Sequence, residues 1–133
     1  MRVLLRIWPA AALALLAAAC APTPRPDAGT FPQALSGLGT EPFWGVRIEG
    51  TTVSYTNPQT PTPHSTTVTR REASGRLELA GTLDGRSLRI TVAPQACSDG
   101  MSDRTYPFTL TLALGEQMLE GCAYPTGMPL PPA

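Results

Sequence analysis

Apolar and polar residues alternate one by one along much of the chain, and this alternation most limits the folds open to it. The segments 44–48, 77–83, 88–92 and 106–114 each carry the pattern. Because successive side chains of a β-strand point to opposite faces, each segment is predicted to form a strand with one apolar and one polar face. No stretch after residue 20 has a helical period, so the chain is predicted to be all-β.

Turn-forming residues separate these segments. Asp84-Gly85 lies between two of them and is a strong signal for a two-residue hairpin. Three further turns are expected, at Glu49-Gly50, Ser74-Gly75 and Gly115-Glu116. Three further strands are expected, over 53–56, 66–72 and 117–123. A sheet with one apolar face must cover that face, so about seven or eight strands predict a small antiparallel meander that closes into a barrel or sandwich.

Proline marks the segments predicted to lie outside the strands. Residues 57–64 contain three prolines and are expected to form a longer loop, which is a candidate binding surface because it would be exposed. Residues 20–36 are expected to be a proline-rich tether, and residues 125–133 an irregular proline-rich tail. The β-domain is therefore expected over residues 37–124.

The first nineteen residues have the features of a secretory signal. Arg2 and Arg6 precede an apolar stretch over residues 7–19. This stretch is shorter than the about 20 residues that a membrane-spanning helix needs. A charged start, a short apolar run and small residues before a cleavage site predict a signal peptide over residues 1–19.

The end of this predicted signal peptide carries a specific sequence motif. Residues 16–20, Leu-Ala-Ala-Ala-Cys, resemble the lipobox of bacterial lipoproteins. The resemblance implies that Cys20 is acylated, with palmitate among its chains, and becomes the first residue of the mature protein. Acyl chains hold a small domain on a membrane without a spanning helix. Ala21 follows the cysteine, which by the same resemblance implies the outer membrane, with the domain facing the periplasm.

Two cysteines remain once Cys20 carries lipid. Cys97 and Cys122 form an even pair in an oxidising compartment and are predicted to form a disulfide. In the chain-entropy model, closing a loop of roughly 25 residues stabilises the fold by roughly 3 kcal/mol. The alternative is a redox or metal-binding pair, but the two cysteines lack the C-x-x-C spacing and the chain has a single histidine.

Composition excludes several classes of function. The chain has no lysine, which rules out Schiff-base chemistry, a P-loop lysine and a Ser–Lys dyad. Without Arg2 and Arg6, two of its 10 basic residues, a chain with 10 acidic residues has a net charge of about −2. Nucleic acid is therefore not an expected partner. No hydrolase, metalloprotease or phosphate-loop motif is present. We predict no cofactor and no enzymatic activity.

Residues 97–103, Cys-Ser-Asp-Gly-Met-Ser-Asp, look least like ordinary strand sequence. Ser98, Asp99 and Asp103 are candidate binding residues that could meet a ligand or a cation. A calcium loop needs about six to eight oxygen ligands and usually more carboxylates. A turn is favoured, in which Asp and Ser accept backbone hydrogen bonds and Gly100 takes a positive φ. No metal site is predicted.

Residues 39–44, Gly-Thr-Glu-Pro-Phe-Trp, open the domain. Trp44 and Phe43 could form an aromatic ligand platform, with Trp44 as the candidate binding residue, although such residues more often pack in the core or close a barrel end. Glu41 could act as an acid, and pairing with an arginine is its alternative role. His64 is the sole histidine and is expected to be exposed on the proline-rich loop, without a catalytic role.

These two motifs, together with Tyr106-Pro107 and Gly121-Cys122, resemble an uncharacterised family of bacterial envelope lipoproteins described as predicted membrane proteins. The resemblance covers roughly residues 37–124 and implies an envelope location and a disulfide, but no activity. The architecture is more distantly similar to the membrane-bound inhibitors of c-type lysozyme and to the META-domain, HslJ-like group. The Ser-Gly-x-x-Tyr pattern of the lysozyme inhibitors is absent from this chain.

The sequence thus favours a lipid-anchored, non-catalytic envelope module. Such a module would bind a protein or glycan partner, with lysozyme inhibition as one variant, or support envelope stress tolerance. One alternative is an enzyme or metal-binding protein that uses Glu41, Asp99 and Asp103, which requires these carboxylates to converge. Another is a small-ligand carrier with an open barrel mouth, which requires an apolar cavity of about 300 Å³ or more.

Overall fold

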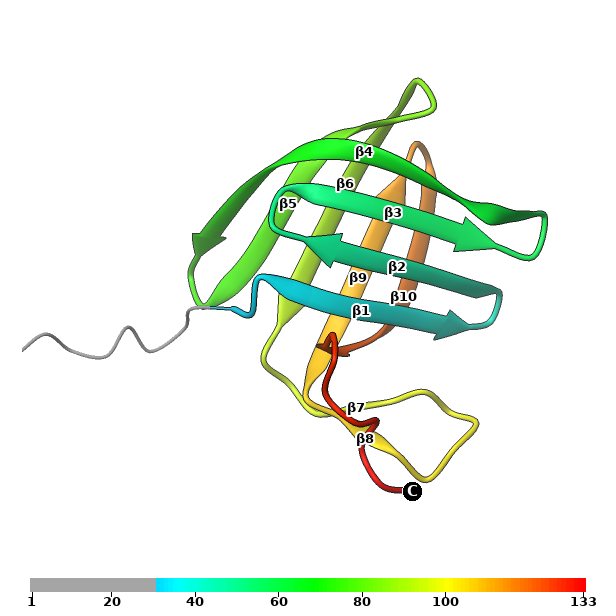
Figure 1. The fold of residues 1–133 in the computed structure, drawn as a ribbon, viewed down its shortest axis with the longest axis vertical. Coiled ribbons are helices and arrows are strands. Elements are labelled where there is room, and N and C mark those ends of the chain that lie inside the picture. Colours follow the sequence, from blue (N-terminus) through cyan, green and yellow to red (C-terminus); the bar gives the residue numbers. More distant parts are fainter. Residues whose placement is uncertain (1–30) are drawn as a thin grey trace, which may run out of the picture.

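The computed structural model describes residues 31–133, and their main feature is a closed barrel of antiparallel strands (Figure 1). The eight barrel strands are β1 (Ala34–Thr40), β2 (Phe43–Glu49), β3 (Thr52–Asn57), β4 (Thr60–Ala73), β5 (Arg76–Leu83), β6 (Arg86–Ala93), β9 (Phe108–Leu114) and β10 (Gln117–Pro125). Each strand pairs with the next, and β1 pairs with β10. The prediction of an antiparallel meander is confirmed, and it closes as a barrel. The described residues contain no helix of the length and apolarity needed to cross a membrane.

The turns between the strands follow the predicted signals. Ser74 and Gly75 have φ of 53° and 71°, and Asp84 and Gly85 have φ of 49° and 75°. Positive φ at both central residues gives a hairpin turn the twist that matches its strands. The turns after β2 and β9 begin with a glycine of positive φ as well.

The first strand begins earlier than the sequence indicated. β1 starts at Ala34, inside the segment predicted to be a tether, and Phe31 and Leu35 are buried in the core. The inward positions of β1 after Leu35 are Gly37 and Gly39, so the strand has almost no apolar periodicity. A Cβ on Gly39 would lie 2.0 Å from Nε1 of Trp44, which shows that the indole occupies this space.

The predicted loop over residues 57–64 is wrong. Only Pro58 and Gln59 form the turn, and β4 begins at Thr60. β4 pairs with β3 up to Thr67 and with β5 only from Val68 onward. Its first half therefore resembles an edge strand, where a missing backbone N–H on the open side is tolerated. This explains how a strand can contain prolines.

The chain leaves the barrel between β6 and β9. Within this excursion, residues 94–107, the short strands β7 (Cys97–Ser98) and β8 (Thr105–Tyr106) form a separate ribbon. Pro107 separates β8 from β9, so the single strand predicted over 106–114 is divided. The predicted disulfide is confirmed: Cys97 of the excursion is bonded to Cys122, which is fully buried on β10.

The barrel interior is filled by apolar side chains. The largest fully buried ones are Leu35, Ile48, Leu77, Leu79, Leu83, Leu88, Ile90, Leu110, Leu112, Leu114, Val53 and Val92. The described residues include no buried polar or charged residue. This packing argues against a small-ligand carrier, which would need an apolar cavity in the same place.

Candidate functional site

The barrel closes along a short seam. β1 and β10 pair only over Leu35–Leu38 and Cys122–Pro125. Trp44 packs on the strands just beyond the last of these pairs and is 5% exposed. A Cβ on Gly121 would lie 2.8 Å from Cζ2 of the indole and 2.0 Å from the Leu38 carbonyl oxygen. Trp44 therefore packs against Gly39 of β1 and Gly121 of β10, as the core interpretation expected, and is not an exposed platform.

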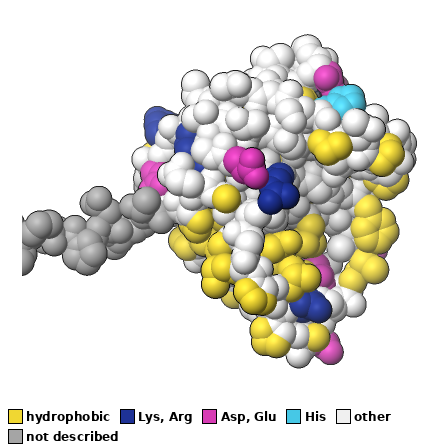
Figure 2. Space-filling view, in the orientation of Figure 1, with side chains coloured by type: hydrophobic (Ala, Val, Ile, Leu, Met, Phe, Trp, Pro, Cys, Tyr) yellow, Lys and Arg dark blue, Asp and Glu magenta, His cyan; other side chains and the backbone are white. Residues whose placement is uncertain are grey.

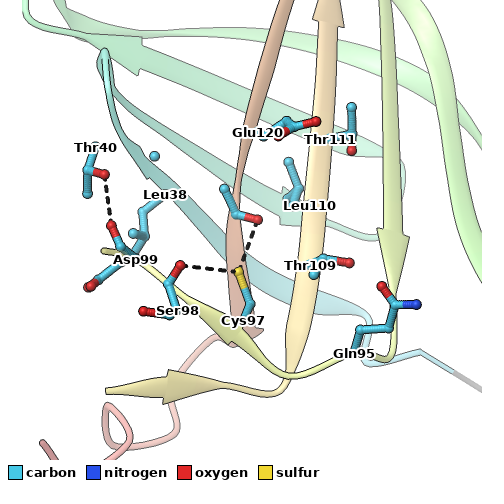
Figure 3. A pocket seen from close by; sticks show the side chains of 12 residues that line it. Leu38, Thr40, Gln95, Cys97, Ser98, Asp99, Thr109, Leu110, Thr111 and Glu120 are labelled. Carbon is cyan, nitrogen blue, oxygen red and sulfur yellow. Dashed lines mark hydrogen bonds between the residues drawn. The ribbon is translucent and has the colours of Figure 1, made fainter. Parts of the chain in front are cut away.

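A groove of about 370 Å³ lies outside this seam, between the barrel wall and the excursion (Figure 3). We call it the seam groove. Its lining is mixed. Leu38, Leu110 and Cys97 contribute apolar surface, and the polar side chains are those of Thr40, Thr109, Thr111, Glu120, Ser98 and Asp99. The Thr40 hydroxyl donates to the Asp99 carbonyl oxygen at 2.9 Å, which ties the excursion to the end of β1.

Asp99 holds the excursion in shape. Its carboxylate accepts hydrogen bonds from Met101 N (2.9 Å), Ser102 N (2.8 Å), the Ser102 hydroxyl (2.8 Å) and the Tyr106 hydroxyl (3.2 Å). A carboxylate has about four lone-pair sites, so these four bonds account for them. The arrangement supports the turn interpretation of this motif, since the carboxylate is already occupied within its own loop.

Charge on Asp99 is stabilised by these donors. Hydrogen bonds from the Ser102 and Met101 amides, and then from the Ser102 hydroxyl, lower the pKa of Asp99 from 3.8 to about 2. The pKa of Tyr106 is raised, first because its hydroxyl is desolvated and second because it donates to the Asp99 carboxylate. Neither shift prepares a group for acid–base work near neutral pH.

The excursion should therefore become less ordered at low pH. A depressed pKa stabilises the folded loop above the unfolded value of 3.8, and this contribution is lost as the pH falls toward about 2. We expect the NMR amide signals of Met101 and Ser102 to titrate with a midpoint near pH 2. An Asp99→Asn chain should lose this titration. Signals that instead titrate near pH 4 would contradict the role given to Asp99.

The other candidate residues of the sequence do not join Asp99 at one site. Glu41 is exposed in the turn between β1 and β2 and is absent from the three ion pairs found among residues 31–133. Asp103 is exposed, and neither it nor Glu41 lines the seam groove. Ser98 lines it, with its hydroxyl accepting from Gly100 N at 3.2 Å. No group of three or more His, Cys, Asp or Glu in the described part of the chain could hold a metal ion.

A second hollow lies at the turns that follow β1 and β3. It has a volume of about 410 Å³ and is lined mainly by apolar residues, which are Phe43, Trp44, Gly45, Pro58 and Pro61, with Thr56 and Asn57 beside them. We call it the distal hollow. Figure 2 shows hydrophobic side chains at the right-hand edge, where Figure 1 places these turns.

Phe43 is the main exposed residue of the distal hollow, with 55% of its surface accessible. The sequence favoured a core position for Phe43 and Trp44 alike, and this prediction is wrong for Phe43. The alternation of the strand was the available signal: if Trp44 points inward, its neighbour must point outward.

The polar atoms of the distal hollow already have partners. Asn57 Oδ1 accepts from the backbone N–H and the hydroxyl of Thr60, at 2.8 and 2.9 Å, and its amide nitrogen donates to the Tyr55 hydroxyl at 3.4 Å. The Thr56 hydroxyl donates to the Gly45 carbonyl oxygen at 3.5 Å. The hollow therefore offers mostly apolar contact to a partner.

His64 is not on a loop, since it lies in β4. Its Nδ1 is 2.5 Å from Oδ2 of Asp84 in the turn between β5 and β6. Both side chains are substantially exposed, and exposed ion pairs contribute little to stability. The pair links β4 to the turn between β5 and β6 and lies outside both hollows described above.

Comparison of the chain with protein-family models, with curated proteins and with solved structures finds no match. The function is therefore argued from the surfaces of the barrel itself.

Proposed function

We propose that the chain is a lipid-anchored envelope protein, held at the outer membrane by Cys20, whose barrel is a non-catalytic module that binds a protein partner through the distal hollow. The observation that carries the proposal is Phe43, an exposed aromatic residue beside an apolar, proline-lined hollow. Two residues that the sequence offered as candidate binding residues make their contacts within the protein. Trp44 fills the seam, and Asp99 holds the excursion.

The position of the distal hollow suits an anchored module. The chain enters the barrel at Phe31, just before β1, and the hollow lies beside the turn at the opposite end of this strand (Figure 1). β1 has 7 residues, which span roughly 23 Å at about 3.3 Å per residue. A protein tethered by its N-terminal segment would present this far end to partners.

The chemistry of the distal hollow favours a protein over a glycan. Sugar rings need hydrogen-bond partners for their hydroxyls, whereas Asn57 and Thr56 are engaged within the barrel. Protein interfaces are enriched in exposed aromatic anchors with surrounding apolar contacts, and such anchors carry much of the binding energy. Phe43 with Pro58 and Pro61 has this character.

Lysozyme of the c-type is the first partner to test, because the sequence suggested a distant similarity to its membrane-bound inhibitors. We expect the purified chain, with Cys20→Ser to prevent acylation, to slow lysozyme digestion of cell walls at stoichiometric amounts. Phe43→Ala should weaken this inhibition on the order of tenfold or more, since loss of a central aromatic anchor costs about 2 kcal/mol. Digestion rates at increasing chain concentration measure both effects.

The matched control is Met118→Ala, which truncates an exposed side chain outside the distal hollow and should leave inhibition unchanged. If no inhibition occurs at a large excess, lysozyme is not the partner. A photo-crosslinking residue at position 43 or at position 118 in intact envelopes then tests the hollow itself. Protein adducts from position 43 alone support the proposal, and glycan adducts from position 43, or no adduct there, would overturn it.

The anchor has its own test. Cells grown with radiolabelled palmitate should incorporate the label into the intact chain and not into Cys20→Ala. A chain that keeps its first nineteen residues and carries no label would refute the envelope anchor while leaving the role of Phe43 open to the binding measurement.

A further inference from the structure

The chain continues beyond β10 as a tail without charged side chains. No charged side chain occurs between Pro125 and Ala133. Met128 and Leu130 are 61% and 46% exposed, and Pro129 and Pro132 are exposed with them. We call these four residues the tail patch. Figure 2 shows hydrophobic side chains gathered over the lower part of the molecule, where Figure 1 places β7, β8 and the C-terminal tail.

The tail patch is held in place on both sides. At its start, Thr126 N donates to the Ala34 carbonyl oxygen at 3.0 Å, and the hydroxyls of Ser36 and Thr126 are 2.8 Å apart. Near its end, Arg104 Nη1 donates to the Pro131 carbonyl oxygen at 2.7 Å. These contacts fix apolar side chains on the surface although the barrel core does not enclose them.

The same end of the barrel receives the N-terminal segment. Phe31 packs on Phe108 with ring centroids 5.6 Å apart, and its N–H donates to Glu72 Oε1 at 2.8 Å. Arg70 Nη2 donates to the Pro32 carbonyl oxygen at 2.9 Å. Thr126, where the tail begins, bonds to Ala34, three residues after Phe31. The tail therefore begins, two residues before Met128 of the tail patch, beside the point where the chain arrives from Cys20.

We propose that the tail patch lies against the lipid surface of the bilayer that holds Cys20. This inference rests on the proposed lipid anchor. About 11 peptide links separate Cys20 from Phe31, so the arriving end of the barrel stays within about 40 Å of the acylated residue. Tethering makes the contact intramolecular, which allows a patch too small to bind a membrane alone to stay on it.

The chemistry of the patch matches a lipid interface better than water. Its side chains are apolar and uncharged, and exposed patches of this kind mark sites of interaction. Side chains such as Met and Leu can be buried at the boundary of headgroups and acyl chains, as in peripheral amphipathic elements.

The test compares two exposed methionines at different places on the barrel. Met128 is 61% exposed in the tail patch, and Met118 is 64% exposed near the turn between β9 and β10. Met128→Trp and Met118→Trp are each made in the chain from Cys20 onward. This chain is coupled through the Cys20 thiol to a maleimide phospholipid, in phosphatidylethanolamine–phosphatidylglycerol vesicles with or without brominated acyl chains. Trp44 gives the same background in both proteins.

We expect brominated chains to reduce the emission of the added indole at position 128 about twofold, because an indole at the headgroup–acyl boundary contacts them. The indole at position 118 should be unaffected. Adding Leu130→Asp to Met128→Trp should remove the quenching. Chemical coupling replaces acylation, so the two experiments test different claims. Absence of palmitate label would contradict the anchor, whereas absence of quenching would contradict the membrane contact of the tail patch.

Three results would overturn the proposal. The indole at position 128 could show no quenching, or both indoles could be quenched equally. The emission at position 128 could also shift to the blue without lipid, in proportion to protein concentration, which would make a second copy of the chain the occupant.

Discussion

Trp44→Ala is expected to lower the free energy of unfolding by about 3–5 kcal/mol, the usual cost of emptying a space that a large aromatic side chain fills. The indole lies against Gly39 and Gly121, which belong to strands that no longer pair at this point. The side chains at the two adjacent positions cannot repack to fill the cavity, because both residues are glycine. A small domain has about 5–15 kcal/mol of stability, so this variant should be close to unfolding.

Urea unfolding followed by far-ultraviolet circular dichroism measures the loss, and Phe43→Ala is the matched control. Phe43 is the preceding residue of the same strand and is exposed, so its truncation should change stability by no more than about 0.5 kcal/mol. A loss of less than about 1 kcal/mol for Trp44→Ala would show that the seam does not depend on the indole.

Removal of the disulfide has the second large expected effect. The bond closes a segment of 25 residues, and replacing both Cys97 and Cys122 by alanine should cost about 3 kcal/mol through the greater freedom of the unfolded chain. Loss of the buried sulfur of Cys122 adds a smaller packing term. The barrel strands should still form, since β7 and β8 lie outside the barrel sheet.

The double variant should also loosen the excursion more than the barrel. Amide hydrogen exchange would show this as faster exchange of residues 97–106 than of the strands β5 and β6, and urea unfolding would give the global loss. Uniform acceleration across all strands would mean that the bond stabilises the barrel directly. Unchanged stability would mean that the unfolded state of the variant is already as restricted as that of the disulfide-bonded chain.

The fold followed from the sequence wherever side-chain volume alternated. β6 and β9 place leucine, isoleucine and valine inward at every second position, and β5 does so except at Gly81. Their turns contain Asp84-Gly85 or a glycine at the required φ. β1 escaped detection because two of its inward positions are Gly37 and Gly39. Their partners in packing lie elsewhere in the chain: a Cβ on Gly37 would meet Leu110 and Val46, and one on Gly39 would meet Trp44.

Local composition misled the prediction for β4. Proline is tolerated there because the first half of the strand has a neighbour on one side alone, a fact of sheet topology that the segment itself does not encode. Local sequence was also a poor guide to the candidate site. Asp99 stood out as a polar residue between strands, but its hydrogen bonds to Ser102 and Tyr106 assign it to its own loop. For the tail patch, the sequence missed a contact. Proline-rich composition predicted an irregular tail and gave no indication that Arg104 would bind the Pro131 carbonyl oxygen.

The pairing of β1 with β10 has a consequence for how the protein is made. Leu35 faces Pro125, so the ring of strands cannot close until nearly all of the chain is available. Contacts between distant parts of a chain form slowly, because the entropy of closing a long loop is lost before the contact is gained. A polypeptide that crosses a membrane N-terminus first would remain open, and fit to pass through a translocation channel, until its last strand reaches the far side.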